Sequence, residues 1–385
     1  MSTGRGERET LSFGIETVAK TIPASVKEFW HNTETLEPQR ANFASGRSLG
    51  DFQTSDVRLG RKSIVGDVVS ELCFTNHDDQ LACLMRDEWL ASVVSPVTAI
   101  TIAADATLQQ FTDSGSGFGS FVANTWILVS GFTTAANNGL FFVTAKAAGA
   151  LTVVGPTGTA LVTEAAGDSV TVRPVNFLHT GTTEQTATIQ RRNLDLSLHE
   201  FFTGCSISQG ALTIPPNGIV TMTWTVLGAG YDNVTSVMTP ASAGLDTASP
   251  FDGLSGLYSA HGVATTIMTA FNATVANNTS LTEVLGQDES DEAINRRFNI
   301  TGSVSFLFQN RDHFTRFWAE TETSLVVSMV DPAGNMMPVV LPRIKYTSHS
   351  KPKNDDGPQV ITCNWMALKH ATIGTMAAIL QVPVV

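Results

Sequence analysis

The sequence has few cysteines, few charged residues and no long apolar run. Four cysteines stand among 385 residues, at Cys73, Cys83, Cys205 and Cys363, and no spacing among them is typical of a metal site. So few cysteines make no disulfide framework, and we expect a protein of a reducing compartment. No run of about 18 apolar residues occurs, which excludes a membrane-spanning helix.

Basic residues are also scarce. Lys and Arg number 23 against 35 Asp and Glu, so the formal net charge is −12. An acidic surface repels phosphates, which argues against a protein that grips nucleic acid. The segment MSTGRGERETLSFG is charged and carries no apolar stretch, so we expect no secretory signal.

The chain does contain apolar material, in short strand-like runs. Hydrophobic residues make up 42% and charged residues 15%, which is enough for a buried core and unlike a disordered chain. Residues 220–226 alternate bulky apolar side chains with threonines. A period of two is typical of half-buried strands, and similar runs recur throughout, so the fold class expected is mainly β.

Two segments carry a helical pattern instead. The first is 76–90, with Asn76 or Asp78 as a candidate cap, and the second is 309–322. The apolar residues that share a helix face are Leu81, Leu84, Met85 and Trp89 in the first, and Phe314, Phe317 and Trp318 in the second. Helices this short are marginal alone, so we expect each to pack on a sheet.

The two halves of the chain share one order of elements. VTMTWTVL (220–227) and ITCNWMAL (361–368) match without a gap at Thr221 and Thr362, Trp224 and Trp365, and Leu227 and Leu368. A turn rich in Pro, Asn, Asp and Gly precedes each, and a hairpin precedes the turn, at 186–209 and 324–347. The order strand, helix, hairpin, turn, strand thus occurs twice, which indicates an internal duplication.

The first copy is interrupted by a stretch of different composition. Residues 97–174 hold six charged residues among many Ala, Gly, Thr and Val, and AANNG (135–139) is a hairpin-turn signal. We expect a small all-β domain inserted at a surface loop. The expected organisation is a discontinuous first unit (1–96 and 175–230), the insert (97–174), a linker (231–260) and a second unit (261–385).

Several segments together carry a family resemblance. EFFTGCSISQGALTIPPNGIVTMTWTVLG (200–228) combines a Phe-Thr-Gly-Cys strand, a Pro-Pro-Asn-Gly turn and a Thr-rich strand, and in this it resembles the family of tail tube proteins of long-tailed, non-contractile bacteriophages. RLGRKSIVGDVVSELCFTNHDDQLACLM (58–85) resembles its strand–helix unit, and MVDPAGNMMPVVLPRIKYTS (329–348) its second hairpin. SGFTTAANNGLFFVTAKAAGALTV (130–153) and LVTEAAGDSVTV (161–172) resemble an insert that recurs in such proteins. The resemblance rests on the order of these segments.

The resemblance implies two tandem tail-tube-type units, each a β-sandwich or barrel with a short flanking helix. Rings would stack into the hollow tube of the virion tail, and a duplicated chain would need three subunits to supply six like units. Genomic DNA would pass through without specific binding, which suits an acidic wall.

The implied partners are copies of the chain itself, the tape measure protein, the tail terminator and the distal tail proteins. Assembly would take place in the host cytoplasm, and we expect no membrane partner, cofactor, metal or catalytic residue.

Two polar stretches are candidate contacts between stacked rings. They are 31–62 and 276–297, which occupy corresponding places in the two copies. The arginines at their ends are Arg58, Arg61, Arg296 and Arg297. We expect them to pair with acidic residues of a neighbouring subunit, and the alternative is that they stay solvated and unpaired.

Residues that suggest chemistry have simpler interpretations. Gly115, Gly117 and Gly119 lack the strand–turn–helix context of a phosphate loop, and the acidic run 288–292 lacks the calcium-loop pattern. His77, Asp78 and Asp79 are typical of a helix start. Buried roles are expected for Cys205 as an inert thiol and for Trp224 and Trp365 as packing anchors.

Two other functions fit a β-rich chain. One is a capsid-decoration or tail-fibre protein, and the other is a carbohydrate-binding or carbohydrate-hydrolysing β-sandwich. A lectin or hydrolase needs one asymmetric cleft, whereas a ring uses two like copies, so the duplication favours the tube.

Overall fold

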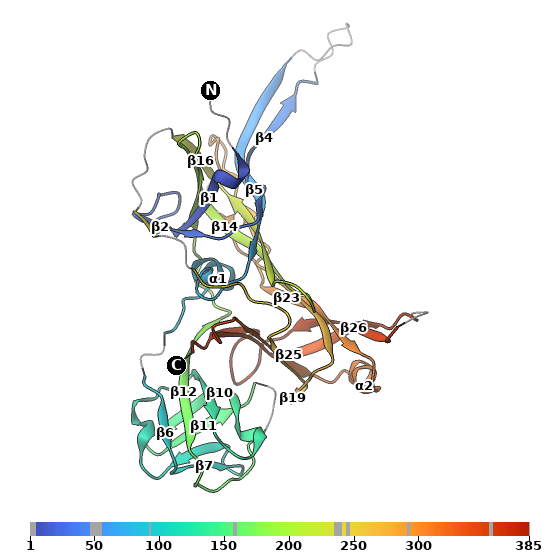
Figure 1. The fold of residues 1–385 in the computed structure, drawn as a ribbon. Helices are drawn as coiled ribbons and strands as arrows, with labels where there is room; N and C mark the ends of the chain where they lie inside the picture. The colour runs from blue at the N-terminus through green and yellow to red at the C-terminus, as the bar shows by residue number, and fades with distance from the viewer. Residues whose placement is uncertain are drawn as a thin grey trace.

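The computed structural model describes residues 5–46, 56–91, 94–156, 160–234, 241–243, 247–290, 293–353 and 357–384. Antiparallel strands dominate it, and the mainly β fold expected from the sequence is confirmed. The molecule is elongated, with a two-stranded arm at one end and the inserted region at the other (Figure 1). No helix among the described residues is both long and apolar enough to cross a membrane.

Strands from the first half of the chain form one antiparallel sheet. Its order is β4–β5–β15–β14–β13–β1–β2. The bounds are β1 (Glu9–Ile15), β2 (Ser25–Phe29), β4 (Glu37–Ala44), β5 (Val57–Glu71), β13 (Ala187–Asn193), β14 (Leu198–Ile214) and β15 (Thr221–Gly228), and β3 (Thr33–Glu34) pairs with β5 ahead of β4. In β15 Met222, Trp224 and Val226 are buried and the threonines between them are half-exposed, so the predicted alternation is confirmed.

Strands from the second half form a second sheet of the same order. It runs β20–β23–β26–β25–β24–β18, with β19 beside β18. The bounds are β18 (Leu257–Ala260), β19 (Val263–Ala264), β20 (Met268–Ala276), β23 (Asn299–Leu307), β24 (Thr323–Val330), β25 (Met336–Ser350) and β26 (Val360–Ala367). Strand for strand it repeats β4–β5–β15–β14–β13–β1, with β20 at the place of β3 and β4.

The two matched tryptophans fix the alignment of the sheets. Trp224 faces Val68 on β5 and Gly210 on β14. Trp365 faces Gly302 on β23 and Tyr346 on β25. Both tryptophans are almost fully buried, as expected for packing anchors. Positions in one sheet can therefore be paired with positions in the other by counting ladder positions from these residues, with the bulges between Ile207 and Gln209 and between Tyr346 and Ser348 left out of the count.

Each helix follows the same strand of its sheet but is shorter than its sequence pattern. α1 (Asp78–Met85) follows β5, and α2 (Asp312–Trp318) follows β23. α1 ends because Arg86 adopts a left-handed conformation, with φ 55°. The capping interpretation is wrong: the N-cap is His77, without a side-chain cap bond, while the Asn76 side chain accepts a hydrogen bond from the backbone N–H of Trp30.

Main-chain pairing between β14 and β20 joins the two sheets. Six residue pairs align, from Gln209 opposite Ala276 to Ile214 opposite Phe271. This edge of β14 is available because β13 pairs only as far as Cys205. One buried apolar cluster runs through both sheets and α1, so the two halves share a core.

The inserted region has a core of its own. Its strands are β6 (Val97–Ala99), β7 (Ile102–Asp105), β8 (Gln110–Asp113), β9 (Thr125–Ser130), β10 (Gly139–Ala147), β11 (Ala150–Val154) and β12 (Val170–His179), with 3₁₀ turns at Gly117–Ser120 and Ala135–Asn137. A separate buried cluster runs from Ile102 to Val172. β9 and β10 pair antiparallel on either side of the expected turn.

β12 carries the inserted region onto the second sheet. It pairs with β27 (Ala378–Gln381), which in turn pairs with β25. Trp126 and Phe142 of the insert pack with Val326 and Leu380 in a third cluster. The expected boundary at 174/175 therefore falls inside a continuous strand, and the insert packs on the half of the chain that it does not interrupt.

Strands also occupy the described parts of 231–260, which the sequence favours as a linker. β16 (Gly230–Val234) continues from β15 along β14, and β17 (Ala241–Ala243) pairs with β2. β18 belongs to the second sheet, and Phe251 is fully buried. Main-chain pairing needs no particular side chain, so a composition rich in Ala and Ser does not prevent it.

Candidate assembly interface

The first candidate contact stretch, 31–62, forms the arm of Figure 1. β4 pairs with the first part of β5, and all eight residues of β4 are exposed. Phe43 and Leu59 are both 63% exposed. The arm thus offers apolar and main-chain surface to another molecule, and residues 47–55 lie outside the described residues.

The second stretch, 276–297, packs against the base of that arm. Nη2 of Arg61 donates a 2.6 Å hydrogen bond to the carbonyl of Val284. Nζ of Lys62 lies 3.0 Å from the carboxylate of Asp288 and 3.6 Å from that of Glu289. β21 (Ser280–Leu281) and β22 (Ala293–Ile294) pair with each other within this stretch. The two stretches therefore contact one another within the chain.

The four predicted arginines have different surroundings. Arg61 is used within the chain, as just described. The Arg58 side chain is 85% exposed and lies 3.7 Å from Asp56. Arg296 and Arg297 are exposed, and no side-chain bond of either is found in the part of the chain that the structure describes. Pairing with a neighbouring subunit stays a prediction for all four arginines.

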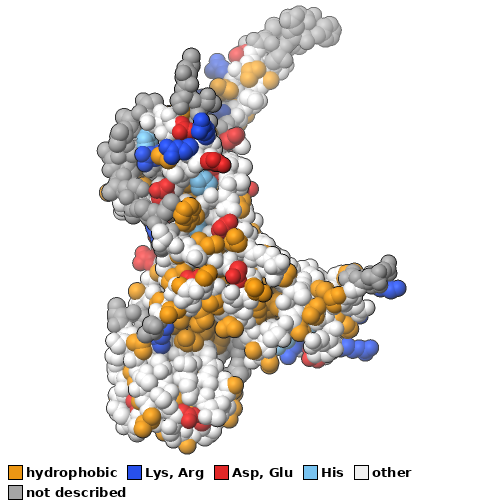
Figure 2. All heavy atoms as spheres, in the orientation of Figure 1, with side chains coloured by type: hydrophobic (Ala, Val, Ile, Leu, Met, Phe, Trp, Pro, Cys, Tyr) orange, Lys and Arg blue, Asp and Glu red, His pale blue; other side chains and the backbone are white. Residues whose placement is uncertain are grey.

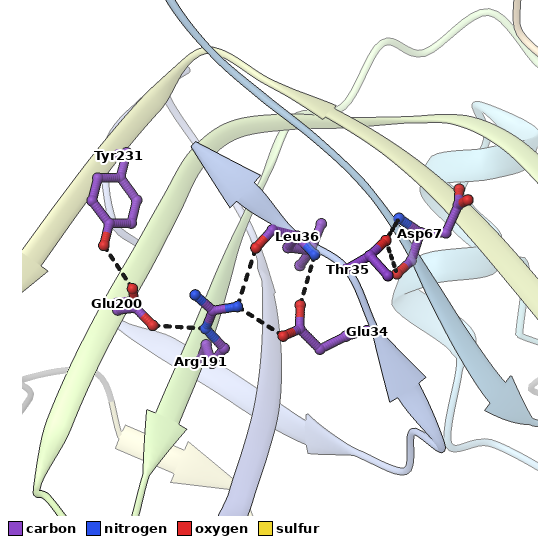
Figure 3. A network of polar contacts seen from close by, with 7 residues as sticks. All are labelled: Glu34, Thr35, Leu36, Asp67, Arg191, Glu200 and Tyr231. Carbon is purple, nitrogen blue, oxygen red and sulfur yellow. Dashed lines mark hydrogen bonds and ion pairs between the residues drawn. The ribbon is translucent and has the colours of Figure 1, made fainter. Parts of the chain in front are cut away.

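A cluster of charged residues that the sequence did not suggest ties β3 to the β13–β14 hairpin (Figure 3). Arg191 donates from Nε to Glu200 and from Nη1 to Glu34, each at 2.7 Å. The hydroxyl of Tyr231 donates to the other oxygen of Glu200 at 2.6 Å. Nη1 of Arg191 also donates to the carbonyl of Leu36 at 3.1 Å. The hairpin register, which places Arg191 opposite Glu200, was the signal available in the sequence.

Two members of this cluster, Arg191 and Glu200, hold their charges at neutral pH. Burial alone would raise the pKa of Glu200, but hydrogen bonds from Arg191 and Tyr231 hold it below its usual range. Burial would lower the pKa of Arg191, but hydrogen bonds to Glu200 and Glu34 raise it. Neither group is poised to exchange protons near pH 7, so Arg191 and Glu200 hold structure and are unsuited to acid–base chemistry.

The second sheet replaces this cluster with apolar residues. Counted from the tryptophans, the Arg191–Glu200 pair falls on Met329 opposite Met337. Glu34 likewise falls on Ala273, since Glu34 faces Val68 and Ala273 faces Gly302. One small apolar cavity beside α1 is lined by Ala273, Met329 and Met337. These three residues thus lie close together, like Glu34, Arg191 and Glu200 in the first sheet.

Other residues weighed in the sequence have structural partners. The backbone N–H groups of Gly115 and Gly117 donate to the carboxylate of Asp113. Cys205 is buried, which raises the pKa of its thiol. Among the described residues no group of three or more His, Cys, Asp and Glu side chains is placed to hold a metal ion.

Comparison with known proteins agrees with the fold. A family model described as phage tail tube protein matches residues 6–377, nearly the whole chain. A search of curated proteins gives no match. With its mainly β fold and its length matched almost end to end, the chain belongs to the phage tail tube protein family.

Proposed function

We propose that three copies of this chain close into a ring, and that rings stack into the hollow tube of a long, non-contractile tail. The observation that carries the proposal is the repeated strand order, β4–β5–β15–β14–β13–β1 and β20–β23–β26–β25–β24–β18, within one polypeptide. Two like sheets per chain make six per ring from three chains. Closure of the ring also pairs strand edges that would otherwise promote uncontrolled association.

The repeated sheets support a division of the chain into two tube units. The first unit comprises 1–96 and 175–230, the insert is 97–174, and the second unit is 261–385. The pairing of β16 with β14 and of β18 with β24 supports assigning most of 231–260 to the units themselves. The insert lies on the outside of the tube, because the same mass on the inner wall would obstruct DNA.

The tube conducts genomic DNA without binding it. The net charge of −12 supports this role, since a basic wall would hold phosphates through counterion release. The role is structural and needs no catalysis. The tape measure protein would lie inside the tube, and the tail terminator and distal tail proteins at its ends.

Electron microscopy of the purified chain, with the mass of its smallest ring, tests the proposal. We expect rings or hollow tubes, and a ring mass of three chains. A stable monomer that binds or cleaves glycans would instead support the carbohydrate-active β-sandwich.

A further inference from the structure

The joint inside the chain has two counterparts elsewhere that no other described strand pairs with along the matching edge. At the joint, residues 209–214 of β14 pair with 271–276 of β20. The matching edge of β25 is 346–351, since β24 pairs only as far as Ile344 and no other described strand takes that edge. In the first sheet, residues 32–37 correspond to residues 271–276 of the second. One edge of 32–37 pairs with β5, and no described strand pairs with the other edge. The chain thus presents both halves of a second joint, on different parts of the molecule (Figure 1).

The helices differ in the same way. Glu71 faces Thr221, and Ser305 faces the matched Thr362. α1 begins as many residues after Glu71 as α2 begins after Ser305, so the two helices can be aligned. On this alignment Leu84 and Trp318 correspond. Leu84 is fully buried at the joint, whereas Trp318 is 76% exposed. A large aromatic side chain at the position of a joint-covering leucine indicates a surface that a partner covers.

A groove lies beside Trp318, where the joint would form. Its volume is about 820 Å³, and it is lined by Phe308, Phe314, Trp318 and Lys351, among others. At the internal joint, Leu81, Leu84 and Met85 of α1 line one cavity with residues of β20, and its volume is only about 40 Å³. Figure 2 shows hydrophobic side chains over the surface that β26 and α2 occupy in Figure 1, with Lys and Arg at its margin.

Charge complementarity favours a second copy as the occupant. The groove carries Arg311 and Lys351, and the Nζ of Lys351 lies 4.0 Å from the centroid of the Phe308 ring. The segment 32–37 carries Glu34 and Glu37, and the amide of Asn32 donates to Glu71. At the internal joint Leu212 lies opposite Ala273. The same register between two chains would place His349 of one chain opposite Glu34 of the other. The basic groove therefore favours 32–37, which carries the exposed Glu37, over a copy's own 271–276, which carries no charged residue.

We infer that residues 346–351 and α2 of one chain accept residues 32–37 of a second copy as an added antiparallel strand, with Trp318 buried beneath it. This inference rests on the proposed function and adds which segments meet and in which register. At the internal joint Ala211 lies opposite Thr274, and Thr213 lies opposite Asn272. The same register between two chains places Ser348 opposite Thr35 and Ser350 opposite Thr33. Added strands gain affinity from main-chain hydrogen bonds and specificity from alternate side chains. Trp318 then covers the charged cluster of Arg191, Glu34 and Glu200 on the second copy, as Leu84 covers Met329 and Met337.

Disulfide trapping tests this register. Thr35→Cys and Ser348→Cys are introduced together, and the assembled protein is oxidised and run on a non-reducing gel. The four native cysteines are buried and do not compete. We expect covalent dimers and trimers from the double variant, none from either single variant, and dimers alone from a mixture of the two single variants.

A matched control places the second cysteine one strand further away. Asn364 faces Ser348 across β25 and β26 and is also exposed. In Thr35→Cys/Asn364→Cys the two cysteines lie two strand spacings apart, roughly 9–10 Å. That exceeds the Cα separation of about 7 Å that a disulfide can span. We expect no covalent oligomer from this pair.

The outcomes separate the inference from the function on which it rests. If rings or tubes form but the 35/348 pair does not crosslink, or the 35/364 pair crosslinks equally, the inference is wrong and the tube stands. If neither rings nor tubes form, the proposed function fails.

A fluorescence measurement covers the case in which the cysteine variants do not assemble. The difference in emission between the unmodified chain and Trp318→Phe reports on Trp318 alone. We expect quenching by acrylamide to fall severalfold on assembly. Quenching equal in the monomer and the tube would overturn the inference.

Discussion

Arg191 donates a 2.7 Å hydrogen bond to Glu200 across β13 and β14. In the second sheet the same position holds Met329 opposite Met337, both almost fully buried. Two like sheets are thus held by an ion pair in one case and by apolar packing in the other. Buried ion pairs are often no more stabilising than well-packed apolar side chains, but they are costly to break.

Removal of one member of the charged cluster should therefore destabilise the chain far more than removal of all three. We expect Arg191→Met to cost about 3–5 kcal/mol of unfolding free energy, because Glu34 and Glu200 are left unpaired. The triple variant Glu34→Ala/Arg191→Met/Glu200→Met copies the second sheet and should change stability by about 1 kcal/mol or less. Denaturant unfolding measures both, and a triple variant as unstable as the single one would contradict the correspondence of the sheets.

Acid should weaken the fold through His77. This side chain is 1% exposed and stacks on Trp224 with ring centroids 5.9 Å apart, and burial lowers its pKa to about 4. An unfolded histidine has a pKa of about 6.5, so between pH 6.5 and 4 the unfolded state binds more protons and stability falls as pH falls.

The variant His77→Phe keeps a ring on Trp224 and cannot be protonated. We expect it to lose about 2–3 kcal/mol less unfolding free energy than the unmodified chain between pH 7 and pH 4.5. Comparison of the two chains isolates His77 from His179 and His261, whose pKa values burial also lowers. An identical pH dependence in both chains would show that His77 is not the cause.

Leu84 and Trp318 should respond in opposite ways to truncation. Leu84→Ala opens a cavity at the internal joint and should cost about 2–5 kcal/mol of unfolding free energy. Trp318→Ala removes an exposed side chain and should change the stability of the monomer by about 0.5 kcal/mol or less. The same substitution should reduce assembly, measured as the fraction of protein that sediments as tubes. Normal assembly of Trp318→Ala would argue against burial of this residue between subunits.

Asn277, directly after β20, should matter more than the exposed Asn272 within that strand. It is fully buried, and its Nδ2 donates to the carbonyls of Leu84 and Ile207 at 3.0 and 2.9 Å, so it ties α1 to β14 beside the joint. We expect Asn277→Ala to cost about 1–3 kcal/mol, because two carbonyls lose their donor. Asn272→Ala is the control, since Asn272 is exposed and its only side-chain bond in the described part of the chain, to Ser303, is 3.4 Å long. Equal losses in thermal unfolding would refute this role.

The features that the sequence predicted well are local ones. Alternating apolar residues gave β15, and two short amphipathic runs gave α1 and α2, because each of these patterns acts within a few residues. The matched Trp224 and Trp365 also predicted the repeated order of strands. The periodicity of apolar side chains thus predicts single strands and helices directly from the sequence.

The features that it missed depend on pairing between distant segments. β12 pairs with β27, and β16 and β18 join sheets from a stretch that resembles a linker, because a free main-chain edge accepts any strand that reaches it. The hydrogen bond from Arg61 to Val284 was also not predicted, because it depends on the second contact stretch folding back onto the arm. The hairpin register could suggest the pairing of Arg191 with Glu200, but the full charged cluster also needed the position of β3, which no local pattern contains.

A cryo-electron microscopy reconstruction of the assembled tube tests the central claim most directly. The account predicts three chains in each ring and six like sheets around the channel, with residues 32–37 of each chain hydrogen-bonded beside 346–351 of the next. A ring of six chains, or a ring in which no sheet continues from one chain to another, would contradict it.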